Sequence, residues 1–142
     1  MIIVVDACVA VRWSVRDEWT EAAYRLMDGR HTVFAPDLVI PEVANTLWKM
    51  ERASQITAEQ AGRALIEIPR GFDRLFGTAA FFERAVEIAR TLTHPVYDCF
   101  YLALSERLKA PLVTLDRKLF NRTRGTPWAD LTTLLGADPA LT

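Results

Sequence analysis

The sequence lacks any long uninterrupted apolar segment. None of its hydrophobic runs approaches the roughly 18 residues that a membrane-spanning helix needs, so we expect no membrane span. No basic residues precede the first apolar run, which argues against a secretory signal peptide. Cysteine is scarce too. Because Cys8 and Cys99 are the only two and both lie beside apolar residues, we expect free thiols and a reducing, cytoplasmic location.

Internal repeats, low-complexity segments and linkers are also lacking, so the length predicts a single domain over residues 1–142. Neither sign of charge is in excess, since 17 basic and 18 acidic residues give a formal net charge of −1. Such a balance is unusual for a nucleic-acid-binding protein. However, a cluster of acids neutralised by a metal ion would leave the rest of the surface basic, so the charge neither supports nor excludes a phosphate-bearing partner.

What the sequence does contain is an apolar run that ends in a carboxylate. Residues 1–5, MIIVV, are typical of a strand that is buried on both faces of a parallel sheet. Asp6 follows directly. Open α/β sheets place their chemistry at the carboxyl ends of the central strands, so Asp6 is the first candidate site residue.

Strands and helices alternate along the rest of the chain. We expect strands at 32–35, 112–115 and 131–135, while 72–76 is either a short strand or an irregular connection. We expect helices at 8–13, 17–28, 37–53, 56–68 and 78–92, and between Pro95 and Pro111. Asp37 is the expected N-cap of the third helix, and Thr57 and Gln60 have the spacing of a capping box at the start of the fourth. In the fifth helix we expect Phe82 on the buried face. This alternation predicts an α/β fold, a three-layer α/β/α sandwich with a central parallel sheet.

Three further carboxylates fall at comparable places. Glu42 lies near a helix start, Asp98 lies in the first turn of a helix that is apolar nearly all round, and Asp116 follows a strand. These places converge on one edge of a parallel sheet. Two carboxylates ~4 Å apart repel by about 4 kcal/mol at an effective dielectric of about 20, so four together call for a cation. Oxygen ligands suit Mg²⁺ or Mn²⁺, which can orient water for attack on a phosphodiester.

A family resemblance rests on four segments: VVDACVAVRW, PDLVIPEVANTL, HPVYDCFYLALSERL and PLVTLDRKLF. They resemble the PIN-domain family, and most of all its VapC-type toxins from prokaryotic toxin–antitoxin pairs. The segments follow the family's order and span nearly the whole chain. The resemblance implies a PIN-like fold and a metal-dependent endoribonuclease that cuts single-stranded or loop RNA. It also implies a homodimer and a small antitoxin protein that often blocks the active site.

The family pattern assigns roles to particular residues. It implies that the acids holding Mg²⁺ or Mn²⁺ are Asp6, Glu42, Asp98 and Asp116, supported by Thr114 and Asn45. Cys8 departs from the pattern, because the family often has Ser there and a thiol is the weaker hydrogen-bonding group. Some relatives carry a further acid where Lys118 and Asn121 stand, so the number of metal ions stays open.

Basic residues are concentrated directly after the fourth acid. The candidates for contacts with RNA phosphates are Arg117, Lys118, Arg122 and Arg124, together with Arg12, Arg16, Lys49 and Arg52. The alternative for each is an ordinary solvated surface residue. We interpret His94 as a helix-start residue rather than a ligand. We interpret the tryptophans at 13, 19, 48 and 128 as core or dimer contacts rather than stacking platforms for bases.

Other functions compete with the nuclease. A haloacid-dehalogenase-type phosphatase needs a second Asp two residues after the first, and Cys8 occupies that place. A phosphoacceptor receiver domain needs paired acids near Asp6 and a Lys after a late strand, whereas Lys109 precedes its strand. The remaining alternative is a catalytically silent PIN fold that only binds RNA or a protein partner. The presence of all four acids counts against it.

Overall fold

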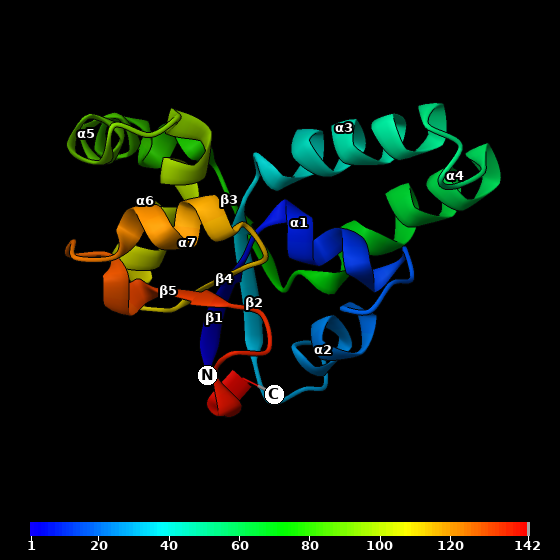
Figure 1. Ribbon diagram of the computed structural model, residues 1–142, viewed down its shortest axis with the longest axis horizontal. Helices are drawn as coiled ribbons and strands as arrows, with labels where there is room; N and C mark the ends of the chain where they lie inside the picture. The colour runs from blue at the N-terminus through cyan, green and yellow to red at the C-terminus, as the bar shows by residue number, and fades with distance from the viewer. Residues whose placement is uncertain (142) are drawn as a thin grey trace.

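A five-stranded parallel sheet lies at the centre of the computed structural model, which describes residues 1–141 (Figure 1). The strands are β1 (Ile2–Val5), β2 (Thr32–Pro36), β3 (Arg74–Phe76), β4 (Leu112–Thr114) and β5 (Thr132–Leu134), in the order β3-β2-β1-β4-β5. Val4 lies opposite Phe34 of β2 and Leu112 of β4, so β1 is central. The all-parallel sheet confirms the predicted α/β class.

Helices cover both faces of this sheet. They are α1 (Ala7–Ala10), α2 (Thr20–Arg25), α3 (Val39–Arg52), α4 (Ala58–Glu67), α5 (Phe82–Leu92), α6 (Val96–Leu108) and α7 (Arg117–Thr123). Figure 1 shows α1 to α4 on the right of the strands and α5 to α7 on the left. Right-handed crossovers explain this division, because the strand order runs one way from β1 to β3 and the other way from β1 to β5. The result is the expected three-layer sandwich.

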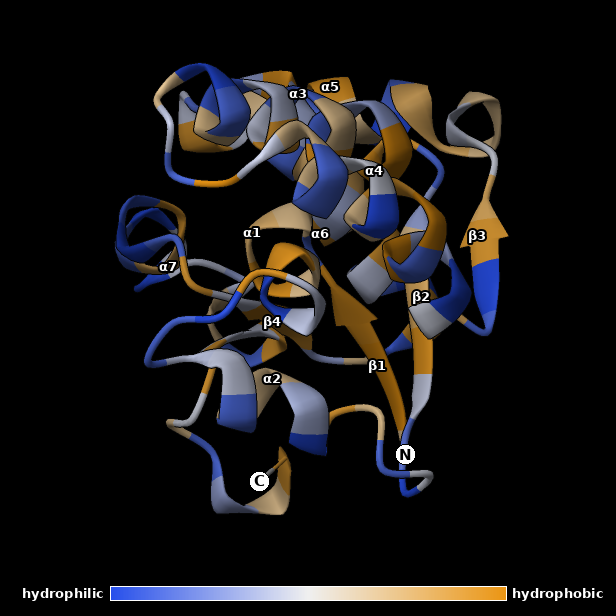
Figure 2. Cartoon of the chain, turned by 90° about the vertical axis from the view of Figure 1, so that its right-hand side faces the viewer, coloured by the Kyte–Doolittle hydropathy of each residue, from blue (hydrophilic) through white to orange (hydrophobic). Residues whose placement is uncertain are grey.

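The core is centred on β1 and α6. Ile3, Val4 and Val5 have no exposed surface, and Figure 2 shows β1 coloured as hydrophobic throughout. Helix α6 packs on β1, β2 and β4, and Leu102 and Leu104 on opposite sides of it are both fully buried. An apolar sequence around the whole helix is therefore what burial of α6 requires. No helix within residues 1–141 combines the length and apolarity needed to cross a membrane.

Several predicted elements are confirmed with shifted boundaries. Thr57 and Gln60 form the predicted capping box of α4, with backbone-to-side-chain bonds of 3.1 and 2.8 Å. The segment left open at 72–76 contains β3. The helix expected at 17–28 shrinks to α2, because Asp17 is used in the preceding turn, where its Oδ1 accepts the backbone N–H of Trp19 at 2.8 Å.

The predicted N-cap of α3 was wrong. Leu38 occupies the cap position and makes no side-chain capping bond. Asp37 Oδ1 instead accepts the backbone N–H of Thr78 at 3.2 Å, which ties the start of α3 to the chain leaving β3. Asp37 thus binds a backbone group 41 residues later in the chain and does not cap the helix beside it.

The predicted face of one other helix also needs correction. Phe82 is 51% exposed, because a 3₁₀ turn at Thr78–Ala80 precedes α5 and the buried face becomes Ala85, Ile88 and Leu92. Of the tryptophans expected to be core or dimer contacts, Trp13 and Trp128 are buried in the core. Trp48 on α3 is 53% exposed, so for Trp48 only the dimer contact stays a prediction. The basic run after Asp116, for which the sequence predicts no element, forms α7.

Candidate active site

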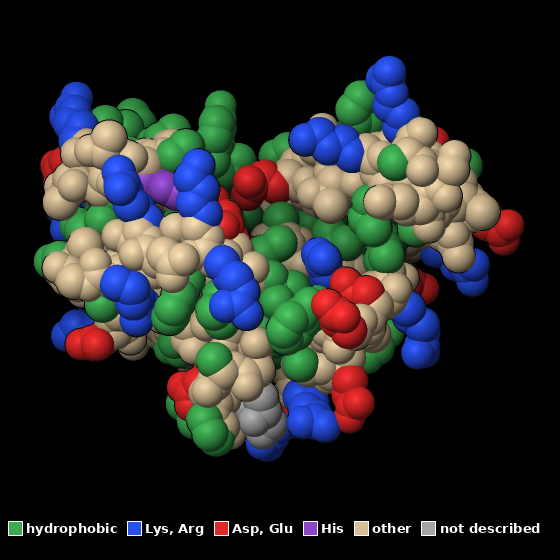
Figure 3. All heavy atoms as spheres, viewed as in Figure 1, with side chains coloured by type: hydrophobic (Ala, Val, Ile, Leu, Met, Phe, Trp, Pro, Cys, Tyr) green, Lys and Arg blue, Asp and Glu red, His purple; other side chains and the backbone are tan. Residues whose placement is uncertain are grey.

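The candidate site lies where the direction of the strand order reverses, between β1 and β4. Asp6 follows β1 and Asp116 comes two residues after β4, while Glu42 and Asp98 lie in the first turns of α3 and α6. All four line one cavity of about 240 Å³, together with Ala7, Cys8, Asn45, Thr46 and Tyr101. Figure 3 shows acidic side chains at the hollow between the two lobes. The structure therefore brings the four predicted acids together.

Asp6 is the most buried of these acids. It caps α1, and its Oδ1 accepts the backbone N–H of Val9 at 3.2 Å and the thiol of Cys8 at 2.8 Å. Burial raises the pKa of Asp6 from 3.8 to about 6. The hydrogen bonds from Cys8, Thr114 and Val9 act in the opposite direction, and the charge of Asp98 adds to the rise. Ionised Asp6 is therefore a costly charge in the absence of a cation.

Thr114 joins two of the acids. Its hydroxyl is fully buried, donates to Asp6 Oδ2 and accepts the backbone N–H of Asp116 at 3.0 Å. Cys8 makes the contact expected of the family's Ser, since its thiol donates to Asp6 and its sulfur accepts the N–H of Leu115 at 3.3 Å. Burial and the neighbouring Asp6 raise the pKa of the Cys8 thiol, so it remains a protonated donor.

Glu42 is held by a tyrosine of α6, a contact that the sequence did not predict. Its Oε1 accepts the hydroxyl of Tyr101 at 2.6 Å, across from α3 to α6. Burial raises the pKa of Glu42, the bond from Tyr101 opposes this, and the charge of Asp98 adds to the rise. The signal that was missed is the hydroxyl itself, because a buried tyrosine on the inward face of a helix needs a polar partner.

Asp98 and Asp116 each have a local partner. Asp98 Oδ2 lies 2.6 Å from Nε2 of His94, one helical turn earlier. The interpretation of His94 as a helix-start residue did not include this contact. Asp116 caps α7, where its Oδ1 accepts the backbone N–H groups of Lys118 and Leu119 at 2.9 and 3.2 Å. Both partners leave one carboxylate oxygen unused.

The donor set fits a hard divalent cation. Within residues 1–141, Glu42 Oε2, Asp98 Oδ1 and Asp116 Oδ2 accept no hydrogen bond, so three carboxylates each retain a free oxygen beside the charge of Asp6. No Lys or Arg lines the cavity. Oxygen-only ligands with uncompensated negative charge suit Mg²⁺ or Mn²⁺. Among residues 1–141, however, no three acidic, His or Cys side chains lie close enough together to hold a metal ion as they stand, so the carboxylates would have to draw together around the ion.

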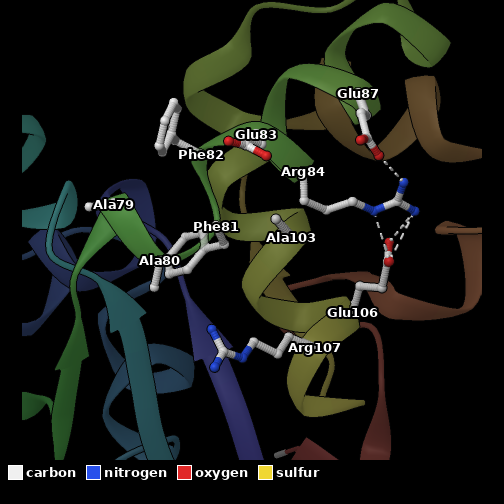
Figure 4. Close-up of a pocket in the computed structure, with 10 residues that line it drawn as sticks. All are labelled: Ala79, Ala80, Phe81, Phe82, Glu83, Arg84, Glu87, Ala103, Glu106 and Arg107. Atoms are coloured by element: carbon white, nitrogen blue, oxygen red, sulfur yellow. Dashed lines mark hydrogen bonds and ion pairs between the residues drawn. The ribbon is translucent and has the colours of Figure 1, made fainter.

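A second cavity, of about 590 Å³ at the start of α5, provides a contrast (Figure 4). Two of its three acids are paired with Arg84, which lies 2.8 Å from Glu87 and 3.0 Å from Glu106. Arg107 also lines it, so three acids face two cations. Its net charge is smaller than that of the Asp6 cavity, where four acids face none.

The predicted supporting and basic residues have different surroundings. Asn45 is exposed and lines the acidic cavity. Arg122 binds the carbonyl oxygens of Leu92 and Thr93 at 2.6 and 3.0 Å, and Arg124 binds that of Ala129 at 2.7 Å. Both guanidinium groups therefore help to hold the fold together, a role that was not expected from the sequence. Contact with RNA stays a prediction for the whole basic run.

Some of the remaining basic candidates contact other groups of the protein, and others are exposed without a partner in the described part of the chain. Arg12 is tied to the carbonyl oxygen of Cys8 at 2.7 Å and to Asp17 at 2.9 Å. Arg52 lies over the ring of Trp48. In contrast, the side chains of Arg117 and Lys118 are exposed and have no hydrogen-bond partner among residues 1–141.

Comparison with known proteins agrees with this geometry. A sequence model of the PIN domain matches residues 3–125. Ribonuclease VapC3 of Pyrobaculum aerophilum is 34% identical over 121 residues, which cover 84% of this chain and 92% of the relative. Ribonuclease VapC9 of Mycobacterium tuberculosis is 31% identical over 118 residues, which cover 83% and 88%.

Two solved structures share the fold. The crystal structure of PAE2754 from Pyrobaculum aerophilum superposes with a TM-score of 0.68 at 23% identity, over 89% of this chain and 82% of that one. VapBC2 from Rickettsia felis, bound to a DNA fragment from its promoter, gives a TM-score of 0.64 at 13% identity, over 94% and 98%. Sequence and fold therefore agree, and the chain belongs to the PIN-domain family, among its VapC-type members.

Proposed function

We propose that this chain is a metal-dependent endoribonuclease that cuts single-stranded or loop RNA at the acidic cavity. The observation that carries the proposal is the convergence of Asp6, Glu42, Asp98 and Asp116, from four separate segments, on one cavity without a basic residue. Relatives named as VapC ribonucleases support the reaction class. The four acids are the proposed ligands of Mg²⁺ or Mn²⁺.

The surrounding residues would prepare this site for an ion and a phosphodiester. A bound divalent cation would supply Lewis-acid stabilisation of the phosphodiester and a water of lowered pKa. Thr114 and Cys8 orient Asp6, Tyr101 orients Glu42, and His94 orients Asp98. These bonds leave one oxygen of each of three carboxylates directed to no other protein group within residues 1–141. Asn45 adds an exposed amide at the rim.

The first test is cleavage of a mixed-sequence single-stranded RNA by the purified chain with Mg²⁺, with Mn²⁺ or with EDTA. We expect cut fragments with either ion and none with EDTA. Asp6→Asn should abolish cleavage, because an amide cannot supply the charge that holds the cation. Asp130→Asn, which changes an exposed acid outside the cavity, is the matched control. A protein that binds RNA but never cuts it would favour the catalytically silent alternative.

We also propose that the chain is a single-domain cytoplasmic toxin, restrained by a small antitoxin. The names of its relatives support this role. Brief induced expression should arrest growth and leave cut ends on cellular RNA. Co-expression of a short neighbouring reading frame should prevent both effects. Growth arrest that persists in the Asp6→Asn variant would contradict the proposal, because it would not depend on the nuclease.

A homodimer is the proposed assembly. Four large apolar side chains on α3 and α4 are exposed: Ile40, Trp48, Leu65 and Ile66. Apolar surface concentrated on two neighbouring helices is typical of an interaction face. Light scattering after gel filtration should give twice the chain mass of 16.1 kDa, and a monomer at micromolar concentration would contradict the proposal.

A further inference from the structure

A third cavity, of about 760 Å³, lies beside the acidic one and has the opposite charge. It is lined by Thr93, His94, Pro95, Lys118, Asn121 and Arg122. None of these residues is acidic, and two are cations. The cavity lies between the α5–α6 connection and α7, on the left lobe of Figure 3, where Lys and Arg side chains and a histidine gather beside the acidic hollow.

The cations of this cavity are available to a ligand. Arg122 uses Nε and Nη2 to bind the carbonyl oxygens that end α5, so the partial negative charge of that helix end offsets part of the Arg122 charge. Its Nη1 has no partner within residues 1–141. The ammonium group of Lys118 and the amide of Asn121 are exposed and make no side-chain hydrogen bond within the same residues. The cavity thus offers the ammonium of Lys118, unpaired among the described residues, the remaining positive charge of Arg122 at Nη1, and an amide.

A single hydrogen bond separates the two cavities. His94 lines the basic one and Asp98 lines the acidic one, and their side chains meet at 2.6 Å. A phosphate bound at the acids would depend on a cation for its charge balance. The adjacent phosphate of the same RNA strand would lie beyond that cation and would need positive charge from the protein. The change from a negatively charged cavity to a positively charged one, across the His94–Asp98 hydrogen bond, matches this requirement.

We propose that the basic cavity binds a backbone phosphate of the RNA, one that flanks the phosphate to be cut. Lys118 and Arg122 supply the charge and Asn121 supplies a hydrogen bond. This inference rests on the proposed function and adds to it the path of the strand. It also divides the basic run, because Arg117 and Arg124 do not line the cavity.

The test measures binding of a short single-stranded RNA in EDTA, so that no cleavage occurs, over a series of salt concentrations. Three variants each lower the net charge by one: Lys118→Ala, Asn121→Asp and Arg117→Ala. Only the first two alter the cavity. For single strands each phosphate contact contributes roughly 0.7 to the slope of log affinity against log salt. We therefore expect Lys118→Ala to lose about that much slope and both cavity variants to bind at least about three times more weakly than Arg117→Ala.

Equal losses in all three variants would overturn the proposal, because they would report net charge alone. Loss of affinity for a protein partner but not for RNA would overturn it too. The outcome is separable from the proposed function: if the wild type cuts RNA while the three variants bind alike, the nuclease stands and the subsite falls. If no RNA is cut but the cavity variants bind more weakly than Arg117→Ala, the cavity binds an RNA phosphate, but that phosphate flanks no cut site and the nuclease is refuted.

Inorganic phosphate gives an independent readout on the full chain. In NMR titrations with phosphate, the resonances of His94 and Asn121 should shift together in the wild type. Asn121→Asp should abolish the His94 shift, since a carboxylate in the cavity repels the anion. Shifts in α3 or α4 in place of the cavity would overturn the assignment.

Discussion

Asp6 is a residue whose charge weakens the fold that carries it. Its pKa is about 6 in the folded protein and 3.8 is its ordinary value, so the folded state holds the proton more tightly than the unfolded chain. Stability contributed by this group therefore falls as the pH rises from about 4 to about 6, and it stays low above that range. The cation that would offset this cost is the one proposed for the site.

We expect Asp6→Asn to stabilise the metal-free protein at pH 7.5 by about 1–3 kcal/mol, because the buried charge is gone and the amide keeps an acceptor for Val9. The gain should shrink at pH 4.5, where Asp6 is already protonated in the folded state. Urea unfolding at both pH values measures it, with Asp130→Asn as the control. A less stable Asp6→Asn protein at pH 7.5 would refute this account.

Tyr101 provides a second prediction at the scale of one side chain. Tyr101→Phe removes the donor to Glu42 and should raise the pKa of that carboxyl further, since the bond now lowers it. The concentration of Mg²⁺ needed for half-maximal cleavage should rise about 3- to 10-fold, which corresponds to a net hydrogen-bond contribution of about 1 kcal/mol. Tyr97→Phe is the matched control, because Tyr97 is 61% exposed on the same helix. An unchanged Mg²⁺ requirement in Tyr101→Phe would remove Tyr101 from the site.

At the scale of elements, a close approach links the end of α4 to the first helical segment. The 3₁₀ turn Ile68–Gly71 follows α4 and lies against Trp13, which is itself packed on Phe72 with ring centroids 4.9 Å apart. A Cβ at Gly71 would lie 2.6 Å from the Trp13 ring and 2.9 Å from the sulfur of Met27. Only glycine fits between them.

Gly71→Ala should therefore destabilise the protein by about 1–3 kcal/mol, the usual cost of overpacking a core. Gly62→Ala, in the middle of α4 with no atom near its added Cβ, should stabilise by about 0.5–1 kcal/mol through helix propensity. Thermal unfolding of the two variants beside the wild type measures both signs. If Gly71→Ala were as stable as Gly62→Ala, the packing of Gly71 against Trp13 would be loose enough to accept a methyl group.

For the molecule as a whole, the sheet topology concentrates like charges at one point. Parallel strands deliver Asp6 and Asp116 to the same edge, and helices from both faces add Glu42 and Asp98. A ligand that binds only the folded state raises its stability, by about 2.7 kcal/mol at one hundred times its Kd. Saturating Mg²⁺ or Mn²⁺ should thus raise the melting temperature at pH 7.5.

The shift should diminish below pH 6, where protonated Asp6 no longer attracts the ion, and it should be absent in Asp6→Asn. Differential scanning fluorimetry with and without EDTA measures it. Ca²⁺ is a useful comparison, because it shares the charge of Mg²⁺ but takes a larger and looser set of oxygens. If none of the three ions changed the melting temperature of the wild type, the proposed metal site would be contradicted.

Patterns local in the sequence predicted much of this molecule. The apolar run before Asp6, the capping box at Thr57 and the all-round apolar α6 are confirmed, because hydrophobic periodicity and capping act over a few neighbouring residues. The convergence of the four acids on one cavity also followed from the order of the elements, since parallel strands share one carboxyl edge.

Only the tertiary structure decided which groups hold these acids and which cations are free. Tyr101 reaches Glu42 over 59 residues of chain and Thr114 reaches Asp6 over 108. Asp37, the predicted local N-cap, instead accepts a hydrogen bond from the backbone N–H of Thr78. Arg122 binds the end of α5 while Lys118 stays unpaired among the described residues. A buried polar group binds whichever partner the packing brings within reach, and distance along the chain does not reveal that partner.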